Sequence, residues 1–223
     1  MNDVILSAEG ISKSYQRGSE RVHALREVDF SLKAGEFVSV VGPSGSGKST
    51  LLHLLGLLET PSSGRIKIDG REMSGLREPG LVKTRRGSIG FIFQQFLLLP
   101  TLTVRENIEL PLLFSKKKAR PGKIAEIMDL LGLSPRSNHL PHQLSGGEMQ
   151  RVSIGRSLIN EPKIIMADEP TGNLDSVTSQ KIFTLFKKLN ADGLSLVIVT
   201  HNAGLAAMAT RVVKLRDGGI VAG

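Results

Sequence analysis

The chain has 223 residues, of which 40% are hydrophobic and 22% are charged, as in ordinary globular proteins. It contains no cysteine, which excludes a disulfide framework and a thiolate metal site. Its longest apolar stretches, 51–58 and 96–100, are far shorter than the ~20 residues that cross a bilayer, so we expect a soluble and most simply cytoplasmic protein.

The net charge of +8 admits nucleic acid, anionic lipid or polyphosphate as partners. The positive charge is spread along the chain, and only KKKAR at 116–120 forms a dense run. We interpret that run as a solvated loop, with a membrane-facing role as the less favoured alternative. Diffuse basicity without stacking aromatic residues is weak evidence for nucleic acid, so none is expected as a partner.

Two kinds of strand pattern follow one another along the chain. The first 36 residues and 64–74 contain short, alternating strands punctuated by turns, which indicate a small antiparallel sheet. Other runs are continuously apolar, as in strands buried on both faces of a parallel sheet, namely 36–42, 88–94, 162–169, 194–201 and 210–218.

Helical periodicity appears between these runs. Residues 176–190 place apolar side chains on one face, at Ile182, Leu185, Phe186 and Leu189. Residues 95–160 contain further helical segments, and we interpret them as an insertion between two sheet strands. Strand and helix in alternation predict an α/β fold with right-handed crossovers.

The first chemical motif is GPSGSGKST at 42–50, between the strand EFVSVV and the helical LLHLLGLL. This strand–loop–helix context is the one that G-x-x-x-x-G-K-[ST] requires of a phosphate-binding loop. Its glycines let the backbone amides point at phosphate, Lys48 reaches the β/γ oxygens, and the Ser49 hydroxyl ligates Mg²⁺. A Gly/Ser linker is the disfavoured alternative. We expect the whole loop to bind nucleotide: Gly42, Pro43, Ser44, Gly45, Ser46, Gly47, Lys48, Ser49 and Thr50.

A second motif, IIMADE, ends a buried apolar run on two carboxylates. Adjacent carboxylates at a strand end repel each other unless a cation is near. We therefore predict that Asp168 holds Mg²⁺ and that Glu169 orients an attacking water. A plain acidic turn is the alternative.

LSGGEMQ at 144–150 raises a different question. Ser145 and Glu148 form a capping box at the start of a helix. The capping box does not explain Gly146 and Gly147, which destabilise a helix start. A helix N-terminus with bare amides and a serine hydroxyl is an anion site, and two copies of the chain in head-to-tail contact would each close on the other's ATP.

These motifs together resemble the ABC-transporter ATPase family, in which GPSGSGKST, LSGGE, IIMADEPTGNLDS and VIVTH occur in this order. The resemblance implies a homodimer that sandwiches two ATP, with the signature residues Ser145, Gly146, Gly147 and Glu148 at the other subunit's nucleotide and Gly146 and Gly147 lying against it. It also implies an adenine-stacking role for Tyr15, for which a half-buried strand residue is the alternative. The remaining implied residues are Gln94 at Mg²⁺ (preferred over Gln95), Asp175 at the dimer seam and His201 at the γ-phosphate, with Lys48 and Glu169 in catalysis.

The resemblance predicts a P-loop NTPase with a RecA-like core, an N-terminal antiparallel β subdomain and an inserted α-helical subdomain. We expect one domain over 1–223, with the core in 1–94 and 161–223 and the helical signature subdomain in 95–160. The histidines His139 and His142 lie three apart, but no third ligand is near, so a metal pair is disfavoured.

LLHLLGLLETPSSG and FQQFLLLPTLTVRENIELPLL further resemble the lipoprotein-release and macrolide-efflux subgroup. This implies a separate integral-membrane permease, docking near 95–114, and a peripheral location on the cytoplasmic side of the membrane. Some of the apolar residues Phe96–Leu99 are candidates for lining a groove in which a helix of the permease docks. Packing in the core of the helical subdomain is the alternative. Two other functions are alternatives: a nucleic-acid or ribosome-associated ATPase, and a regulatory ATPase of a cell-division-type complex.

Overall fold

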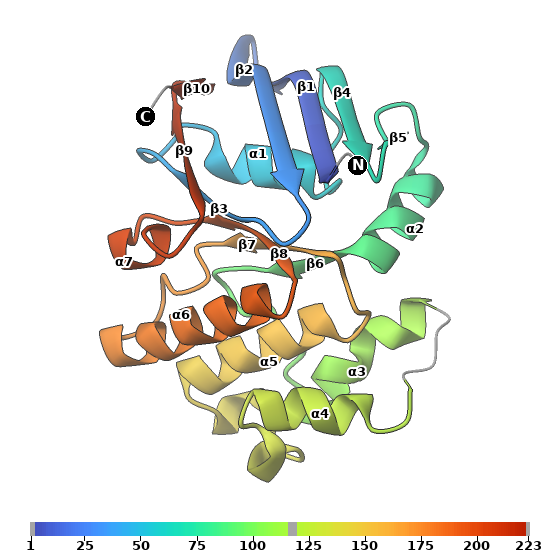
Figure 1. Cartoon of the computed structure of the whole chain (residues 1–223), viewed down its shortest axis with the longest axis vertical. Coiled ribbons are helices and arrows are strands. Elements are labelled where there is room, and N and C mark those ends of the chain that lie inside the picture. The colour runs from blue at the N-terminus through green and yellow to red at the C-terminus, as the bar shows by residue number, and fades with distance from the viewer. Residues whose placement is uncertain (1–2, 116–119, 222–223) are drawn as a thin grey trace.

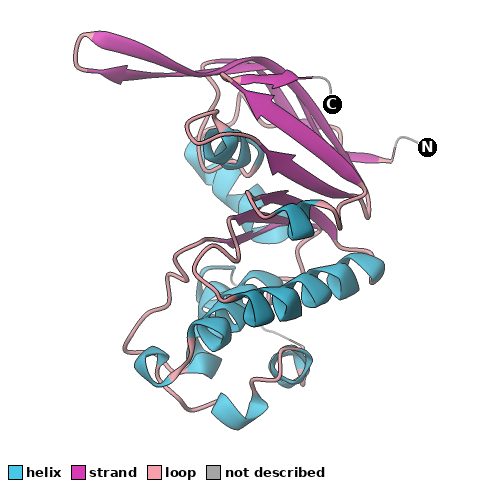
Figure 2. Cartoon of the chain, turned by 90° about the vertical axis from the view of Figure 1, so that its left-hand side faces the viewer, coloured by secondary structure: helices cyan, strands magenta, loops and turns pink. Residues whose placement is uncertain are grey.

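The computed structural model describes residues 3–115 and 120–221, so residues 116–119 of the basic run lie outside the described residues and the interpretation of that run as a solvated loop is untested. The chain forms two sheets in separate layers, with helices between and below them (Figure 1). Seen from the side, the strands gather at one end of the molecule and most of the helices at the other (Figure 2).

The first sheet is antiparallel, with the order β2-β1-β4-β5. Its strands are β1 (Val4–Arg17), β2 (Glu20–Lys33), β4 (Ser63–Ile68) and β5 (Arg71–Glu72). The sheet was predicted, but β1 and β2 are 14 residues each rather than short strands. Register shifts break the β1–β2 pairing at several places, including between Ala8 and Ile11. Each bulge re-phases the inside–outside alternation, so one long hairpin has the sequence pattern of several short strands.

The second sheet has the order β10-β9-β3-β8-β7-β6 and is parallel except for β10, which pairs with β9 in the antiparallel direction. Its strands are β3 (Phe37–Val41), β6 (Ile89–Ile92), β7 (Ile164–Asp168), β8 (Ser195–Val199), β9 (Arg211–Arg216) and β10 (Gly219–Val221). Four of the five predicted runs are buried on both faces, but β9 alternates between buried and exposed residues. It lies one strand from the sheet edge, where one face is open to solvent.

The parallel sheet separates two cores, because successive strand residues point to opposite faces. Ile164 and Met166 of β7 pack toward the antiparallel sheet, around helix α1 (Lys48–Leu55). Ile165 and Ala167 of the same strand pack toward the helices on the far side. The expected α/β fold is confirmed.

The helices on the far side are α3 (Val104–Ser115), α4 (Lys123–Leu130), α5 (Gly146–Leu158) and α6 (Ser176–Ala191), with short turns η1 (Ser134–Arg136) and η2 (Pro141–Gln143) and the small helix α7 (Ala203–Ala206). The predicted face of α6 is inward, since Ile182, Phe186 and Leu189 are buried. Helix α2 (Glu78–Ser88) was not predicted; Leu81 is its single buried residue, so it carries no apolar stripe. No helix in the described part of the chain is long and apolar enough to span a membrane.

Two glycines allow a matched test of packing. A Cβ on Gly56, which ends α1, would lie 2.3 Å from the Phe91 ring and 3.0 Å from the Leu52 carbonyl. Gly87 of α2 is exposed and has open space at the same position. Gly56→Ala should destabilise the protein by about 1–3 kcal/mol through overpacking, whereas Gly87→Ala should stabilise it by roughly 0.5–1 kcal/mol through helix propensity. Urea unfolding of both variants checks the two signs, and equal signs would contradict this account of α1 packing.

Candidate active site

The phosphate loop leaves β3 and enters α1, as its sequence context predicted. Its glycines meet backbone from other parts of the chain: a Cβ on Gly42 would lie 2.1 Å from the Leu215 carbonyl oxygen, and one on Gly47 would lie 2.4 Å from the Ala24 carbonyl oxygen. Gly47 also has a left-handed φ of 100° as the N-cap of α1. Gly42 and Gly47 are therefore required by packing as well as by loop curvature, whereas Gly45 has open space at its Cβ position and a left-handed φ of 77°.

This loop lines a cavity of about 560 Å³ at the carboxyl ends of the parallel strands. The sequence-predicted residues in its wall are Gly42, Ser44, Gly45, Gly47, Lys48, Ser49, Thr50, Gln94, Asp168, Glu169 and His201. Val22, His23 and Ala24 of β2 complete one side and were not predicted. Their position follows from the pairing of Val22 with Tyr15 in the hairpin, which no local sequence motif signals.

Lys48 is held at the centre of the loop. Its Nζ donates to the carbonyl oxygens of Gly42 at 2.9 Å and Pro43 at 2.8 Å. Within the described part of the chain, the buried Oγ of Ser46 has no hydrogen-bond partner. Lys48 and the N-terminus of α1, both at the cavity, fit a site that accepts an anion.

Asp168 lies at the end of β7, partly buried. Burial raises the pKa of its carboxyl, and a hydrogen bond from the Ser49 side chain opposes that rise. A hydroxyl beside a carboxylate is an oxygen donor set that suits Mg²⁺. The described residues contain no group of three or more His, Cys, Asp or Glu that could hold a metal. Phosphate oxygens and water would therefore supply the other ligands, as is usual for Mg²⁺.

Glu169 turns away from Asp168 and meets His201. Its Oε2 lies 2.9 Å from Nδ1 of His201 and accepts from the backbone N–H of His201 at 3.3 Å. Glu169 has a φ of 45°, which is uncommon outside glycine and typical of functional sites. Its side chain is 17% exposed and that of His201 is 71% exposed. The pair thus presents a fixed carboxylate and an accessible imidazole to the cavity.

The segment that follows Glu169 is tied to two other parts of the chain. The buried Gln150 of α5 donates from Nε2 to the Pro170 carbonyl at 2.7 Å. Asn173 donates to the Gln94 carbonyl at 3.0 Å, and the Gln94 side chain returns a long contact of 3.4 Å. Gln94 lines the cavity, and Gln95 is not among the residues of its wall.

Tyr15 lies beside the cavity rather than in its wall. Its hydroxyl donates to Glu59 at 2.7 Å, and the Lys13 ammonium lies 5.1 Å from the centre of its ring. The side chain remains 37% exposed. Burial and the Glu59 contact raise the pKa of Tyr15, while a hydrogen bond with Thr50, a residue of the cavity wall, lowers it.

The signature segment lies on α5, outside the wall of this cavity. The predicted capping box is confirmed: the Glu148 amide donates to Ser145 Oγ at 3.3 Å, and the Ser145 amide donates to Glu148 at 2.8 Å. Gly147 has a reason within its own chain, because a Cβ there would lie 2.4 Å from Cγ2 of Thr178. At Gly146 the nearest atoms would lie at 3.5 Å or more, which is ordinary contact. Asp175 caps α6 by accepting from the Thr178 amide at 2.9 Å.

Comparison with known protein families identifies the family of this chain. Residues 25–172 match the sequence profile of a family described as ABC transporter. The chain belongs to the ABC transporter family. The expectations of a P-loop NTPase fold and of an ABC ATPase are thereby confirmed.

Relatives of this ABC ATPase span bacteria and archaea. The ABC transporter ATP-binding protein MJ0796 of Methanocaldococcus jannaschii, itself uncharacterised, is 47% identical over 221 residues, which cover 96% of this chain and 94% of that protein. The macrolide export ATP-binding/permease protein MacB of Bdellovibrio bacteriovorus is 46% identical over 214 residues, which cover 96% of this chain. The chain spans about one third of that protein, 33% of its length.

A solved structure is similar over nearly the whole ATPase. It is the dimer of the MJ0796 ATP-binding cassette in a post-hydrolysis state bound to ADP and Pi, with a TM-score of 0.90 and 45% identity. The match covers 97% of each chain.

The two signature glycines can be separated by stability. Gly147→Ala should lower stability by about 1–3 kcal/mol, because its methyl group overlaps Thr178. Gly146→Ala should not destabilise the protomer, since its methyl group has room. Adding Thr178→Ser to Gly147→Ala removes the overlapping methyl group and keeps the hydroxyl, so it should restore most of the loss. Thermal melts of the three variants decide this; equal losses at Gly146 and Gly147 would refute the packing explanation.

Proposed function

We propose that the protein is a homodimeric ATPase that drives a separate integral-membrane permease. One observation supports the dimer most directly: the cavity gathers Lys48, Asp168 and Glu169, while the signature residues of the same chain lie on α5 outside its wall. A second copy would supply that missing side. The post-hydrolysis dimer of MJ0796 is a precedent for such an assembly.

In this proposal the phosphates of ATP lie in the cavity, against the amides of the phosphate loop. Lys48 leaves its carbonyl partners to meet the β- and γ-phosphate oxygens. Ser49 and Asp168 would hold Mg²⁺, with Gln94 beside them, and the metal would supply neutralisation of charge on the β- and γ-phosphates. Tyr15 stacks on the adenine through its exposed surface.

Glu169 orients the attacking water, and His201 keeps the carboxylate directed into the cavity and faces the γ-phosphate. The partner's Ser145, Gly146 and Gly147 meet the same phosphate from the opposite side, with Asp175 at the seam. Catalysis then consists mainly of positioning and charge stabilisation, which closure of the dimer completes. Hydrolysis removes the ligand that joins the two protomers, and the dimer opens.

The role of Glu169 has a sharp test. Glu169→Gln keeps the shape of the side chain but cannot activate water, so we expect retained ATP binding and turnover reduced by about 10²-fold or more. Closed dimers should then accumulate with ATP. Size-exclusion chromatography with light scattering and a phosphate-release assay measure both effects. Glu72→Gln, which removes a carboxylate of β5 outside the cavity, is the control; near-normal turnover by Glu169→Gln would refute the assignment.

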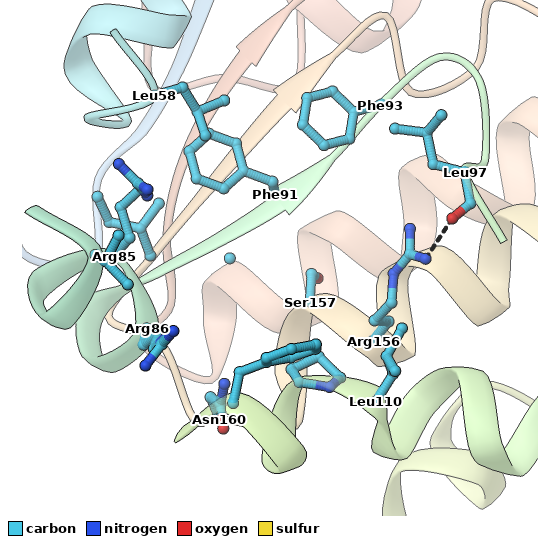
Figure 3. Close-up of a pocket in the computed structure, with 15 residues that line it drawn as sticks. Leu58, Arg85, Arg86, Phe91, Phe93, Leu97, Leu110, Arg156, Ser157 and Asn160 are labelled. Atoms are coloured by element: carbon cyan, nitrogen blue, oxygen red, sulfur yellow. Dashed lines mark hydrogen bonds between the residues drawn. The ribbon is translucent and has the colours of Figure 1, made fainter. Parts of the chain in front are cut away.

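This chain has a candidate groove for docking of the permease. A second cavity of about 610 Å³ lies between α2, β6, α3 and α5 (Figure 3). Its wall is apolar at Leu58, Phe91, Phe93, Leu97 and Leu110, with Arg85, Arg86 and Arg156 among the polar residues. An apolar groove of this kind fits a short amphipathic helix. Leu97 belongs to the predicted Phe96–Leu99 run, and the groove overlaps the expected docking region 95–114.

Arg156 joins this groove to the nucleotide side. Its guanidinium donates to the carbonyl oxygen of Leu97 at 2.5 Å (Figure 3) and to that of Phe96 at 2.9 Å, in the segment that follows Gln94 and Gln95. Burial lowers the pKa of Arg156. We infer a peripheral location on the cytoplasmic side of the membrane, with lipoprotein release or macrolide-type efflux as the transport class.

Adjacent residues of α3 test the groove. Phe114 lines it and is 57% exposed, whereas Leu113 is 78% exposed and belongs to neither wall. Phe114→Ser should reduce co-purification of the permease from detergent-solubilised membranes several-fold, because a buried interface aromatic is lost. Leu113→Ser should leave it unchanged, and the ATPase activity of both isolated variants should equal that of the parent. Equal recovery with both variants would exclude the groove as the docking site.

A further inference from the structure

The signature segment carries its own negative charge. Glu148 Oε2 accepts from the Ser145 amide and the Ser145 hydroxyl, both at 2.8 Å. These contacts, led by the hydrogen bond from the Ser145 backbone, lower the pKa of Glu148, so the carboxylate is ionised at neutral pH. The Ser145 hydroxyl is also a donor that the incoming phosphate of the proposed dimer would use. An anion is therefore already present where a second anion has to bind.

A single cation faces that carboxylate among the described contacts. Nε of Arg136, at the end of η1, lies 3.2 Å from Glu148 Oε1, the oxygen that Ser145 does not use. The Glu148 side chain is 19% exposed and that of Arg136 is 47% exposed. Screening by solvent is thus partial at the carboxylate, and the ion pair removes much of its field.

Arg136 is placed there by the fold rather than by a flexible surface loop. Its Nη1 contacts Nε2 of His139 at 3.2 Å. The backbone of the same turn is fastened to the start of α3, since Val104 donates to the His139 carbonyl at 2.9 Å and Arg105 donates to the Ser137 carbonyl at 3.1 Å. The guanidinium is therefore held on the outer oxygen of Glu148 before any nucleotide arrives.

We propose that Arg136 is a positioning residue for ATP-dependent closure. Arg136 neutralises Glu148, and it draws the Glu148 carboxylate away from the Ser145 donors when the partner's γ-phosphate binds. The inference rests on the proposed homodimer. An uncharged residue at position 148 would not need such a partner. With glutamate there, the Arg136–Glu148 pair allows the capping box in the free protomer and reduces repulsion of the nucleotide once the carboxylate is drawn away in the dimer. Arg136 acts through Glu148 and needs no contact with ATP.

Charge-removing variants in the Glu169→Gln background measure this directly. In that background, Arg136→Gln should raise the ATP concentration for half-maximal dimerisation about two- to fivefold, the size of a partly screened charge interaction. Glu148→Gln keeps the capping box, because glutamine also accepts from the Ser145 amide. In the presence of Glu148→Gln, adding Arg136→Gln should change the half-maximal concentration by less than about 1.5-fold, since the interaction is gone.

Further readouts separate this role from a structural one. Arg105→Gln removes the same charge from a nearby pair, Arg105–Glu109 at 2.7 Å, and should not shift dimerisation. Binding of ATP to the monomer should be equal in all variants. In the active enzyme Arg136→Gln should raise KM and spare kcat, and the KM effect should shrink between roughly 0.05 and 0.5 M salt.

An equal shift by Arg136→Gln with and without the Glu148→Gln substitution would show a purely structural role, and no shift would show no role; either result overturns the inference. Failure of the Glu169→Gln parent to dimerise with ATP would instead refute the proposed homodimer, and with it this inference. If the Glu169→Gln parent dimerises with ATP and Arg136→Gln leaves the ATP concentration for half-maximal dimerisation unchanged, the inference alone is refuted.

Discussion

Helix α5 is the element on which the arrangement of both sites depends, because its start is capped and two polar side chains tie it to other segments. Ser145 caps its start, Gln150 donates from its middle to the Pro170 carbonyl, and Arg156 donates near its end to the carbonyls of Phe96 and Leu97. A helix of 13 residues is about 20 Å long and stiff. The signature tip, the segment after Glu169 and the wall of the apolar groove are therefore attached to one rigid rod.

This attachment gives a physical route between the two cavities. The groove and the phosphate cavity share the segment that runs from Phe93 to Leu97, with Gln94 in the wall of one and Phe93 and Leu97 in the wall of the other. A partner that moves Leu97 would act on Arg156 and hence on α5. In the proposed dimer, the tip of α5 serves the other protomer's nucleotide, so the same rod would connect docking on one subunit with closure on its twin.

The two carboxylates after β7 show how the fold separates tasks that the sequence places side by side. Asp168 stays partly buried beside Ser49, where an oxygen ligand set forms. The positive φ of Glu169 turns the Glu169 side chain toward His201. The two neighbouring carboxylates thereby have different partners: Asp168 remains available for a cation beside Ser49, while Glu169 contacts His201.

What the sequence by itself determined about this protein is local. The phosphate loop, the Asp168–Glu169 strand end and the capping box at Ser145 are readable because each lies within a few consecutive residues, whose spacing is imposed by one strand end or one helix turn. The apolar runs also determined the α/β class, since burial on both faces leaves a continuous pattern. Helix α2 was not predicted, because a surface helix with one buried residue has no apolar stripe in its sequence.

Tertiary structure decided the contacts between residues far apart in the chain. Gly147 against Thr178, Gln150 on Pro170 and the β2 wall of the cavity at Val22–Ala24 all depend on how separate elements pack. Sequence periodicity does not reveal such contacts, because each one depends on a residue that lies far away in the chain. The sequence therefore suggested a nucleotide as the reason for both signature glycines, and the tertiary structure adds a reason for Gly147 within its own chain, its packing against Thr178 of α6.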